Sequence, residues 1–246
     1  MYKKIILSFC LILPFTALSC AQDKISDAER TKTETIIKAY LLENPEIIEE
    51  ALIALHNKRE AEKGEASRAM IAANTDVLYQ NAADYAIGPE DAAITLVEFF
   101  DYRCGYCRKA VEAVSALPEK YDGQVRIVFK EFPILSETSH KAAIAALAAG
   151  RQGKYFEIHQ AFMKTPTQLT EADILKIGED IGLDIEAWKQ DRTDPALSTQ
   201  ITRTQSLARR LGVNATPAFI TDETLITGLD MAQLSKMIET QLAEIG

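Results

Sequence analysis

The feature that most constrains this chain is a pair of cysteines separated by two residues, Cys104-Gly105-Tyr106-Cys107. An apolar run from Ile94 to Phe100 precedes the pair and has the length and composition of a short buried strand. A helical pattern follows the pair, and Pro118 ends that pattern. The two cysteines are therefore predicted to lie where a strand passes into a helix.

The spacing of the two cysteines is suited to dithiol chemistry. Two intervening residues place both sulfur atoms on one face of the first helical turn, close enough to form a disulfide. Cys104 lies at the helix N-terminus, where unpaired N–H groups and the positive end of the helix dipole stabilise a thiolate. A lowered thiol pKa makes this sulfur the attacking group and the better leaving group. We therefore predict that Cys104 is the nucleophile and Cys107 the resolving cysteine.

A zinc site and a structural disulfide are the two alternatives for this pair. Zinc takes four Cys or His ligands, but the other cysteines, Cys10 and Cys20, lie in an N-terminal leader. The three histidines, His56, His140 and His159, have no paired ligand spacing. A structural bridge would close a very small loop and constrain the unfolded chain little. The pattern therefore favours a redox pair, and we predict no metal and no other cofactor.

The first 21 residues have the pattern of a secretory signal peptide, with two lysines, an apolar core and small residues at the end. We predict cleavage after Ala21 and export to the periplasm. The alternative is a lipoprotein signal with lipid attached to Cys20. After cleavage the formal charge of −9 becomes −11, because residues 1–21 carry two lysines and no acid. This charge argues against nucleic acid or an anionic membrane surface as a partner.

Residues 22–62 contain two short amphipathic helical patterns separated by Asn44-Pro45. Two such helices cannot form a hydrophobic core alone, so they must pack on something else. A charged, Ala-rich stretch over residues 63–84 follows and is predicted to be a helical or flexible linker. We predict that residues 22–62 form a homo-oligomer. The alternative is a helical hairpin that caps the chain's own catalytic domain.

Residues 85–246 show the order of elements typical of an α/β sandwich. A strand and a helix around the cysteine pair are followed by a second strand pattern over Gln124–Phe132. A helical block over about residues 136–212, a hairpin and a final helix complete the pattern. This order predicts an α/β fold with an inserted helical subdomain. Thr216-Pro217 comes just before the hairpin, where backbone beside an X-Pro bond can hold an extended substrate segment.

Two segments, Glu98–Cys107 and Val213–Phe219, resemble the DsbA family of exported thiol oxidoreductases, and the resemblance extends over about residues 85–246. It implies a thioredoxin-like fold in which Pro217 is cis and lies against the cysteine pair. It also implies that Thr216 and Pro217 bind substrate, together with Gly105 and Tyr106 between the cysteines. Glu98 would then be buried, with a raised pKa suited to proton transfer for Cys107. The alternative for Glu98 is a partly exposed carboxylate at a strand end.

Residues 30–60, including Leu42–Ile48, are similar to the N-terminal segment of the ScsC branch (suppressor of copper sensitivity protein C). This resemblance implies an exported protein that forms a trimer through the segment and acts as a disulfide isomerase. An isomerase must be kept reduced, so a membrane-bound thiol partner is also implied.

The function predicted from these patterns is thiol–disulfide exchange on protein substrates of the cell envelope. A disulfide isomerase or reductase is the first expectation, and a DsbA-type oxidase is the alternative. Tyr106 takes the position beside Cys107 where histidine is common in strong oxidants, which points to a milder oxidant. A third hypothesis, from another class, is a Cu(I)-binding or chaperone-like module that uses the two soft thiolates.

Overall fold

The computed structural model describes residues 26–165, 169–221 and 224–245. The chain divides into two compact units, Met1–Lys58 and Arg59–Gly246. The predicted signal peptide over residues 1–21, with its lipidation alternative at Cys20, lies outside the described residues. Within the described ranges, no helix has both the length and the apolar character needed to cross a bilayer.

The first unit contains α1 (Asp27–Glu43) and the beginning of α2 (Glu46–Ala72). Ser26 and Glu29 form the capping box at the start of α1: the serine hydroxyl accepts from the Glu29 N–H at 3.3 Å, and the Glu29 carboxylate accepts from the Ser26 N–H at 3.1 Å. The large apolar side chains of this unit are not buried within it. Those that are most exposed are Ile36, Ile37, Tyr40, Leu42, Ile48, Leu52, Ile53 and Leu55.

The second unit is built on a five-stranded mixed sheet in the order β1-β3-β2-β4-β5. The central pair, β2 and β3, is parallel, and every other neighbouring pair is antiparallel. The sequence pattern predicted four of these strands and missed β1. The bounds are β1 Tyr85–Ile87, β2 Ile94–Phe100, β3 Val125–Glu131, β4 Ala218–Thr221 and β5 Thr224–Thr227.

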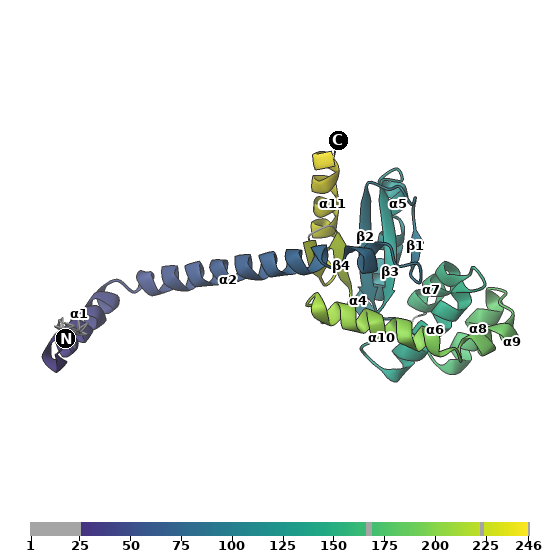
Figure 1. The fold of residues 1–246 in the computed structure, drawn as a ribbon, viewed down its shortest axis with the longest axis horizontal. Helices are drawn as coiled ribbons and strands as arrows, with labels where there is room; N and C mark the ends of the chain where they lie inside the picture. Colours follow the sequence, from purple (N-terminus) through teal and green to yellow (C-terminus); the bar gives the residue numbers. More distant parts are fainter. Residues whose placement is uncertain (1–25, 166–168, 222–223, 246) are drawn as a thin grey trace, which may run out of the picture. The chain divides into compact units, whose positions relative to one another are not determined.

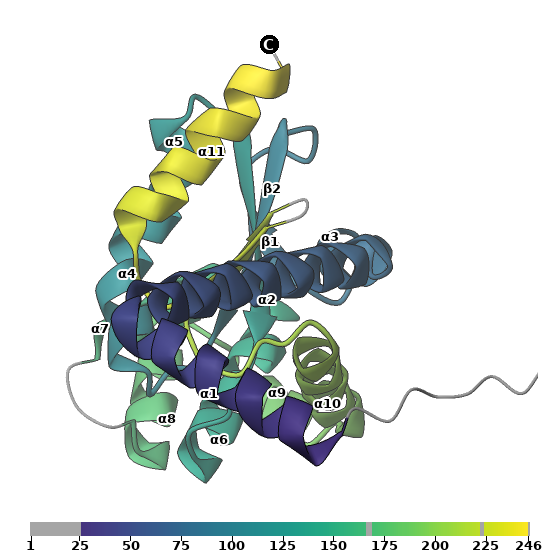
Figure 2. The same cartoon turned by 90° about the vertical axis from the view of Figure 1, so that its left-hand side faces the viewer.

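Helices cover both faces of the sheet. Figure 2 shows α4 (Gly105–Ser115), α5 (Leu117–Lys120) and α11 (Met231–Ile245) on one side of the strands and α3 (Thr75–Tyr79) on the other. One core cluster lies under α4, α5 and α11, and a second lies under α3 and the C-terminal end of α10. Pro118 does not simply end a helix as predicted: it occupies the first turn of α5, where its missing N–H costs nothing.

A helical subdomain is inserted between β3 and β4, as the sequence predicted. Its helices are gathered beside one end of the sheet in Figure 1. Trp188 is fully buried inside this subdomain, and its indole N–H donates to the Ala145 carbonyl at 2.9 Å. The bounds are α6 Glu137–Gly150, α7 Tyr155–Lys164, α8 Glu171–Asp180, α9 Ile185–Asp191 and α10 Pro195–Arg210. The fold is therefore the predicted thioredoxin-like α/β sandwich with a helical insertion.

The last two residues of β3 are buried and point to opposite faces of the sheet, as neighbours in a strand do. Lys130 donates to the Val77 carbonyl at 2.5 Å and forms an ion pair with Asp84, which lies just before β1. Glu131 points to the other face, where it accepts hydrogen bonds from two tyrosines. One strand end thus anchors both the segment that leads into the sheet and the helical insertion.

Candidate active site

The cysteine pair lies at the junction that the sequence predicted, between the end of β2 and the start of α4. Cys104 is the N-cap residue of α4, and its sulfur accepts a hydrogen bond from the Cys107 N–H at 3.4 Å. Both cysteines are free thiols. Cys104 is 7% exposed, whereas Cys107 is completely buried, so only the first sulfur is open to a partner.

The two thiols have pKa values shifted in opposite directions. The Cys104 pKa is lowered to about 5, chiefly by a hydrogen bond from the Cys107 thiol, with further bonds from the Thr216 side chain and from backbone N–H groups. Burial raises the pKa of the Cys107 thiol, and the hydrogen bond to Cys104 and the charge of Glu98 add to the rise. At neutral pH the pair therefore holds one thiolate, on Cys104, and one proton, on Cys107.

The Thr216–Pro217 segment lies against this pair, and its peptide bond is cis, as the family resemblance implied. The Thr216 carbonyl oxygen is 3.1 Å from the Cys104 sulfur, so it accepts from the thiol when that group is protonated. The Pro217 carbonyl accepts from the Gly228 N–H at 2.8 Å, which ties this segment to the end of β5.

Glu98 lies in the middle of β2 and is 2% exposed, so the alternative of a partly exposed carboxylate is wrong. Burial raises its pKa to about 8, and the negative charge of Cys104 contributes to the rise. A carboxyl group with this pKa holds a proton at neutral pH and can exchange it readily.

Gly105 and Tyr106 both face solvent at the start of α4. The Tyr106 ring is 61% exposed, and the Lys109 ammonium lies 5.6 Å from its centroid. A Cβ atom on Gly105 would meet no atom within 4 Å, so this glycine is not required by crowding. Both residues are thus open to a substrate beside Cys104.

Asp101 is a buried site residue that the sequence reasoning missed. Its carboxylate accepts from the backbone N–H groups of Arg103, Ile134 and Leu135 at 2.8, 2.8 and 2.9 Å. Its carbonyl accepts from the Cys104 N–H at 2.9 Å. It therefore ties the loop before Cys104 to the loop after β3. An acidic residue directly after a fully apolar strand was the available signal.

Two other features lie apart from this site. Among the described residues, no group of three or more His, Cys, Asp or Glu side chains is arranged to hold a metal ion. A cleft of about 640 Å³ lies between α3, α6 and α10, and none of the predicted site residues lines it.

Two family models match the chain. The Thioredoxin model matches residues 80–240, and the model of the Copper resistance protein ScsC N-terminal domain matches residues 29–62. The first match covers the sheet, the cysteine pair and the helical insertion. The second covers α1 and the first part of α2.

Solved structures with the same fold include two that share about a third of their residues with this chain. A thioredoxin-like oxidoreductase from Silicibacter pomeroyi DSS-3 is 38% identical, with a TM-score of 0.64, and the match covers 67% of this chain and 95% of that one. ScsC of Proteus mirabilis in a transitional conformation is 31% identical, with a TM-score of 0.65 and coverage of 89% and 97%.

Curated relatives include a Na(+)/H(+) antiporter, NhaA 3, of Salinispora tropica, which is 32% identical over 138 residues. That match covers 55% of this chain, which spans only 21% of the antiporter's length. Because the thioredoxin model covers more than half of the chain and the ScsC structure is matched over nearly all of its length, the chain belongs to the thioredoxin family, among the members related to DsbA and ScsC.

Proposed function

We propose that this protein is an exported thiol–disulfide oxidoreductase that acts on protein substrates through Cys104 and Cys107. The observation that carries the proposal is the split between the two thiols: a stabilised thiolate at the surface and a protonated, buried thiol behind it. Attack on a disulfide needs the first, and resolution of the resulting intermediate needs the second.

The steps of the exchange follow from this arrangement. The Cys104 thiolate attacks a substrate disulfide, so that one substrate sulfur leaves as a thiolate and the other is bonded to Cys104. Glu98, in its carboxylate form, then takes the proton from Cys107, and the new thiolate attacks Cys104. The substrate leaves with two thiols, and the enzyme holds the Cys104–Cys107 disulfide. If a second substrate thiol displaces Cys104 instead, the substrate disulfide is rearranged with no net electron transfer.

The cis Thr216–Pro217 segment and the exposed Gly105-Tyr106 pair would bind the substrate backbone beside Cys104. Main-chain hydrogen bonds of this kind place few demands on substrate side chains. This supports a broad range of protein substrates.

Isomerase or reductase action is the direction we favour, in the periplasm and with a membrane-bound thiol partner that keeps the site reduced. The match of residues 29–62 to the ScsC N-terminal domain supports it, as do the exposed apolar side chains of α1 and α2. We propose that residues 22–62 join copies of the chain, with a trimer favoured. Several sites on one oligomer can hold a misfolded chain and act on it repeatedly.

A DsbA-type oxidase is the second candidate, because of the low pKa of Cys104. A stabilised thiolate favours the reduced enzyme and so makes the disulfide form a stronger oxidant. The value of about 5 for Cys104 lies between roughly 7 in thioredoxin and roughly 3.5 in DsbA. Binding of Cu(I) by the two thiolates is the third candidate, which the copper-resistance N-terminal domain favours.

The deciding experiment uses the chain without residues 1–21, reduced, and a scrambled, fully oxidised substrate enzyme. Recovery of substrate activity that is lost in Cys104→Ala supports the isomerase. Rapid oxidation of a reduced substrate by the disulfide form, without recovery of the scrambled one, supports the oxidase. Stoichiometric Cu(I) binding with neither activity supports the copper module.

The oligomer is tested separately by sedimentation velocity. We expect a Leu52→Ser, Ile48→Ser double variant to sediment as a smaller species than the natural chain. Ile245→Ser is the matched control, because Ile245 is equally exposed but belongs to the second unit. A monomeric natural chain would remove the basis of the oligomer proposal.

A further inference from the structure

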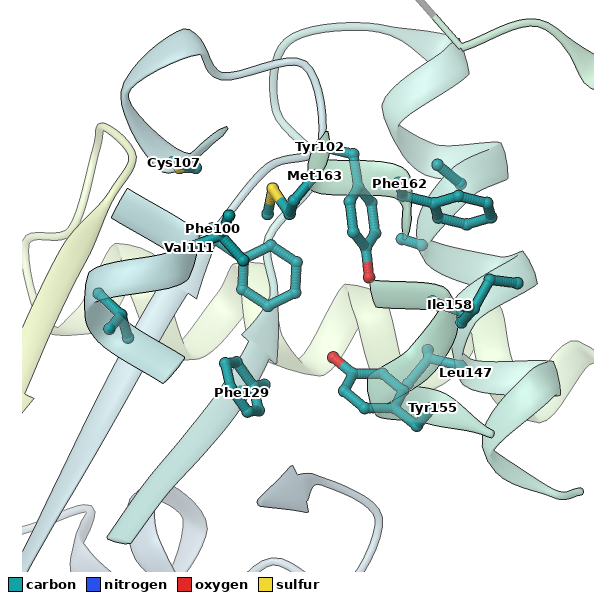
Figure 3. Packing of buried hydrophobic residues seen from close by; sticks show 14 of the residues in the cluster. Phe100, Tyr102, Cys107, Val111, Phe129, Leu147, Tyr155, Ile158, Phe162 and Met163 are labelled. Atoms are coloured by element: carbon teal, nitrogen blue, oxygen red, sulfur yellow. The ribbon is translucent and has the colours of Figure 1, made fainter. Parts of the chain in front are cut away.

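Four buried polar side chains form a cluster directly behind the loop that carries Cys104. The Tyr102 hydroxyl is 2.8 Å from Glu131 Oε1 and 3.2 Å from His159 Nδ1. The Tyr155 hydroxyl donates to the same Glu131 oxygen at 3.0 Å. Each of the four residues is at most 4% exposed. Figure 3 shows the hydroxyl groups of Tyr102 and Tyr155 pointing toward each other from opposite sides.

The cluster connects three parts of the fold that are far apart in the chain. Tyr102 belongs to the loop between β2 and α4, and Glu131 is the last residue of β3. Tyr155 and His159 lie one turn apart on α7, so they share one face of that helix. The ring of Tyr102 also packs edge-on against Phe162 of α7, with centroids 5.3 Å apart. Hence the helical insertion holds the loop that precedes the nucleophile.

Proton positions in the cluster follow from the hydrogen-bond geometry. Both phenols donate to Glu131 Oε1, which uses the single hydroxyl proton of Tyr102. The Nδ1 atom of His159 must therefore carry a hydrogen and donate it to the Tyr102 oxygen. Burial raises the pKa of Glu131 well above its ordinary range and lowers the pKa of His159 to about 3, so both are uncharged at neutral pH.

A neutral cluster exerts little direct electrostatic influence on Cys104, so its effect must pass through the backbone. Tyr102 lies between Asp101, whose carbonyl accepts from the Cys104 N–H, and Cys104 itself. The Cys104 sulfur depends on contacts of 3.4 Å to the Cys107 N–H and 3.1 Å to the Thr216 carbonyl. A small shift of this loop would change both contacts, because hydrogen bonds weaken steeply with distance and angle.

We propose that Tyr102 and Glu131 are positioning residues for the chemistry of Cys104, and that the cluster they form with Tyr155 and His159 fixes the backbone before the nucleophile from the side of the helical insertion. This proposal concerns the same site as the proposed exchange activity and rests on that function for its significance. Its test measures a property of the free enzyme, so it does not require that the substrate assignment be correct.

The test is the pKa of the Cys104 thiol in the reduced chain without residues 1–21, followed by thiolate absorbance near 240 nm as the pH is varied. Tyr102→Phe and Glu131→Met remove the shared hydrogen bonds but keep the buried volume. We expect each to raise the Cys104 pKa by about one unit, which is a tenfold loss of thiolate at low pH. Glu131→Gln retains an oxygen that accepts from both phenols, and we expect it to leave the Cys104 pKa unchanged.

Tyr121→Phe is the matched control. It also removes a phenol that donates to a glutamate, here Glu239 at 3.2 Å, but at an exposed place between α5 and α11. The proposal is overturned if folded Tyr102→Phe and Glu131→Met proteins titrate like the natural chain, or if Glu131→Gln shifts as far as Glu131→Met. Should either apolar variant not fold, Tyr155→Phe, which removes one of the two bonds to Glu131, is compared with the remaining one.

The two readouts separate the two proposals. Unchanged Cys104 titration in variants that differ only in thermal stability would assign the cluster a structural role and leave the exchange activity standing. A shifted titration together with no exchange on any protein disulfide would leave the positioning role standing and refute the proposed function.

Discussion

Replacing Glu98 with glutamine should stabilise the folded protein while slowing its chemistry. Glu98 is buried under the cysteine pair, and its pKa is about 8 against an ordinary value of 4.5. Between these values the folded chain keeps a proton that the unfolded chain has released. The folded state therefore loses stability relative to the unfolded state as the pH rises from 4.5 to 8. Below this window both states are protonated, and above it the loss is constant.

The magnitude follows from the size of this window. Each pH unit inside it costs about 1.4 kcal/mol, so Glu98 destabilises the fold by about 3 kcal/mol at pH 7. Glutamine has nearly the same shape and no charge to bury. The free energy of unfolding of Glu98→Gln should therefore exceed that of the natural chain by about 3 kcal/mol at pH 7 and by almost nothing at pH 4.

The assay is urea unfolding of the reduced proteins at a series of pH values from 4 to 8.5. Glu112→Gln, on the exposed face of α4, is the control, and its difference from the natural chain should stay within about 0.5 kcal/mol at every pH. A difference for Glu98→Gln that does not grow with pH would refute the burial argument. The same variant should release a preformed Cys104 mixed disulfide about a hundredfold more slowly, because no carboxylate remains to take the Cys107 proton.

Three further predictions concern single sites. The rate of Cys104 alkylation by iodoacetamide should fall as the pH falls through about 5, where the thiolate is lost, and a midpoint near 8.5 would contradict the stabilised thiolate. Lys130→Met leaves Asp84 buried without its cation and should cost about 3–5 kcal/mol in urea unfolding, most of which Asp84→Asn should restore in the double variant. Gly178→Ala should cost about 1–3 kcal/mol, read by the fluorescence of Trp188, because its Cβ would lie 2.4 Å from that ring; an unchanged midpoint would show that the ring moves freely.

Local patterns predicted the parts of the protein whose chemistry is local. The position of Cys104 at a helix start depends only on a strand pattern before it and a helix pattern after it. Caps such as Ser26 for α1 and Thr170 for α8 were visible for the same reason, since each bonds within three residues. The order of strands and helices was enough for the fold class and for the place of the insertion.

The features that escaped prediction depend on residues that meet only after folding. Glu131 bonds to Tyr102 and Tyr155, which are 29 and 24 residues away, and no spacing in the sequence marks them. Lys130 reads as a solvent-facing strand residue, yet it is buried because a segment 46 residues earlier supplies Asp84. The strand β1 is only three residues long, too short for an alternating pattern to appear.

The paired anchors at the end of β3 also bear on how the chain finds its correct strand alignment. A slip of one residue along β2 would turn every side chain of β3 to the opposite face. Lys130 would then be inserted among apolar rings on the side of α7, and Glu131 would face the carboxylate of Asp84. Either placement leaves a charged or polar group buried without its partner. The two adjacent residues therefore act as a key that only one pairing of the central strands accepts, which selects against misaligned sheets while the active site is assembled.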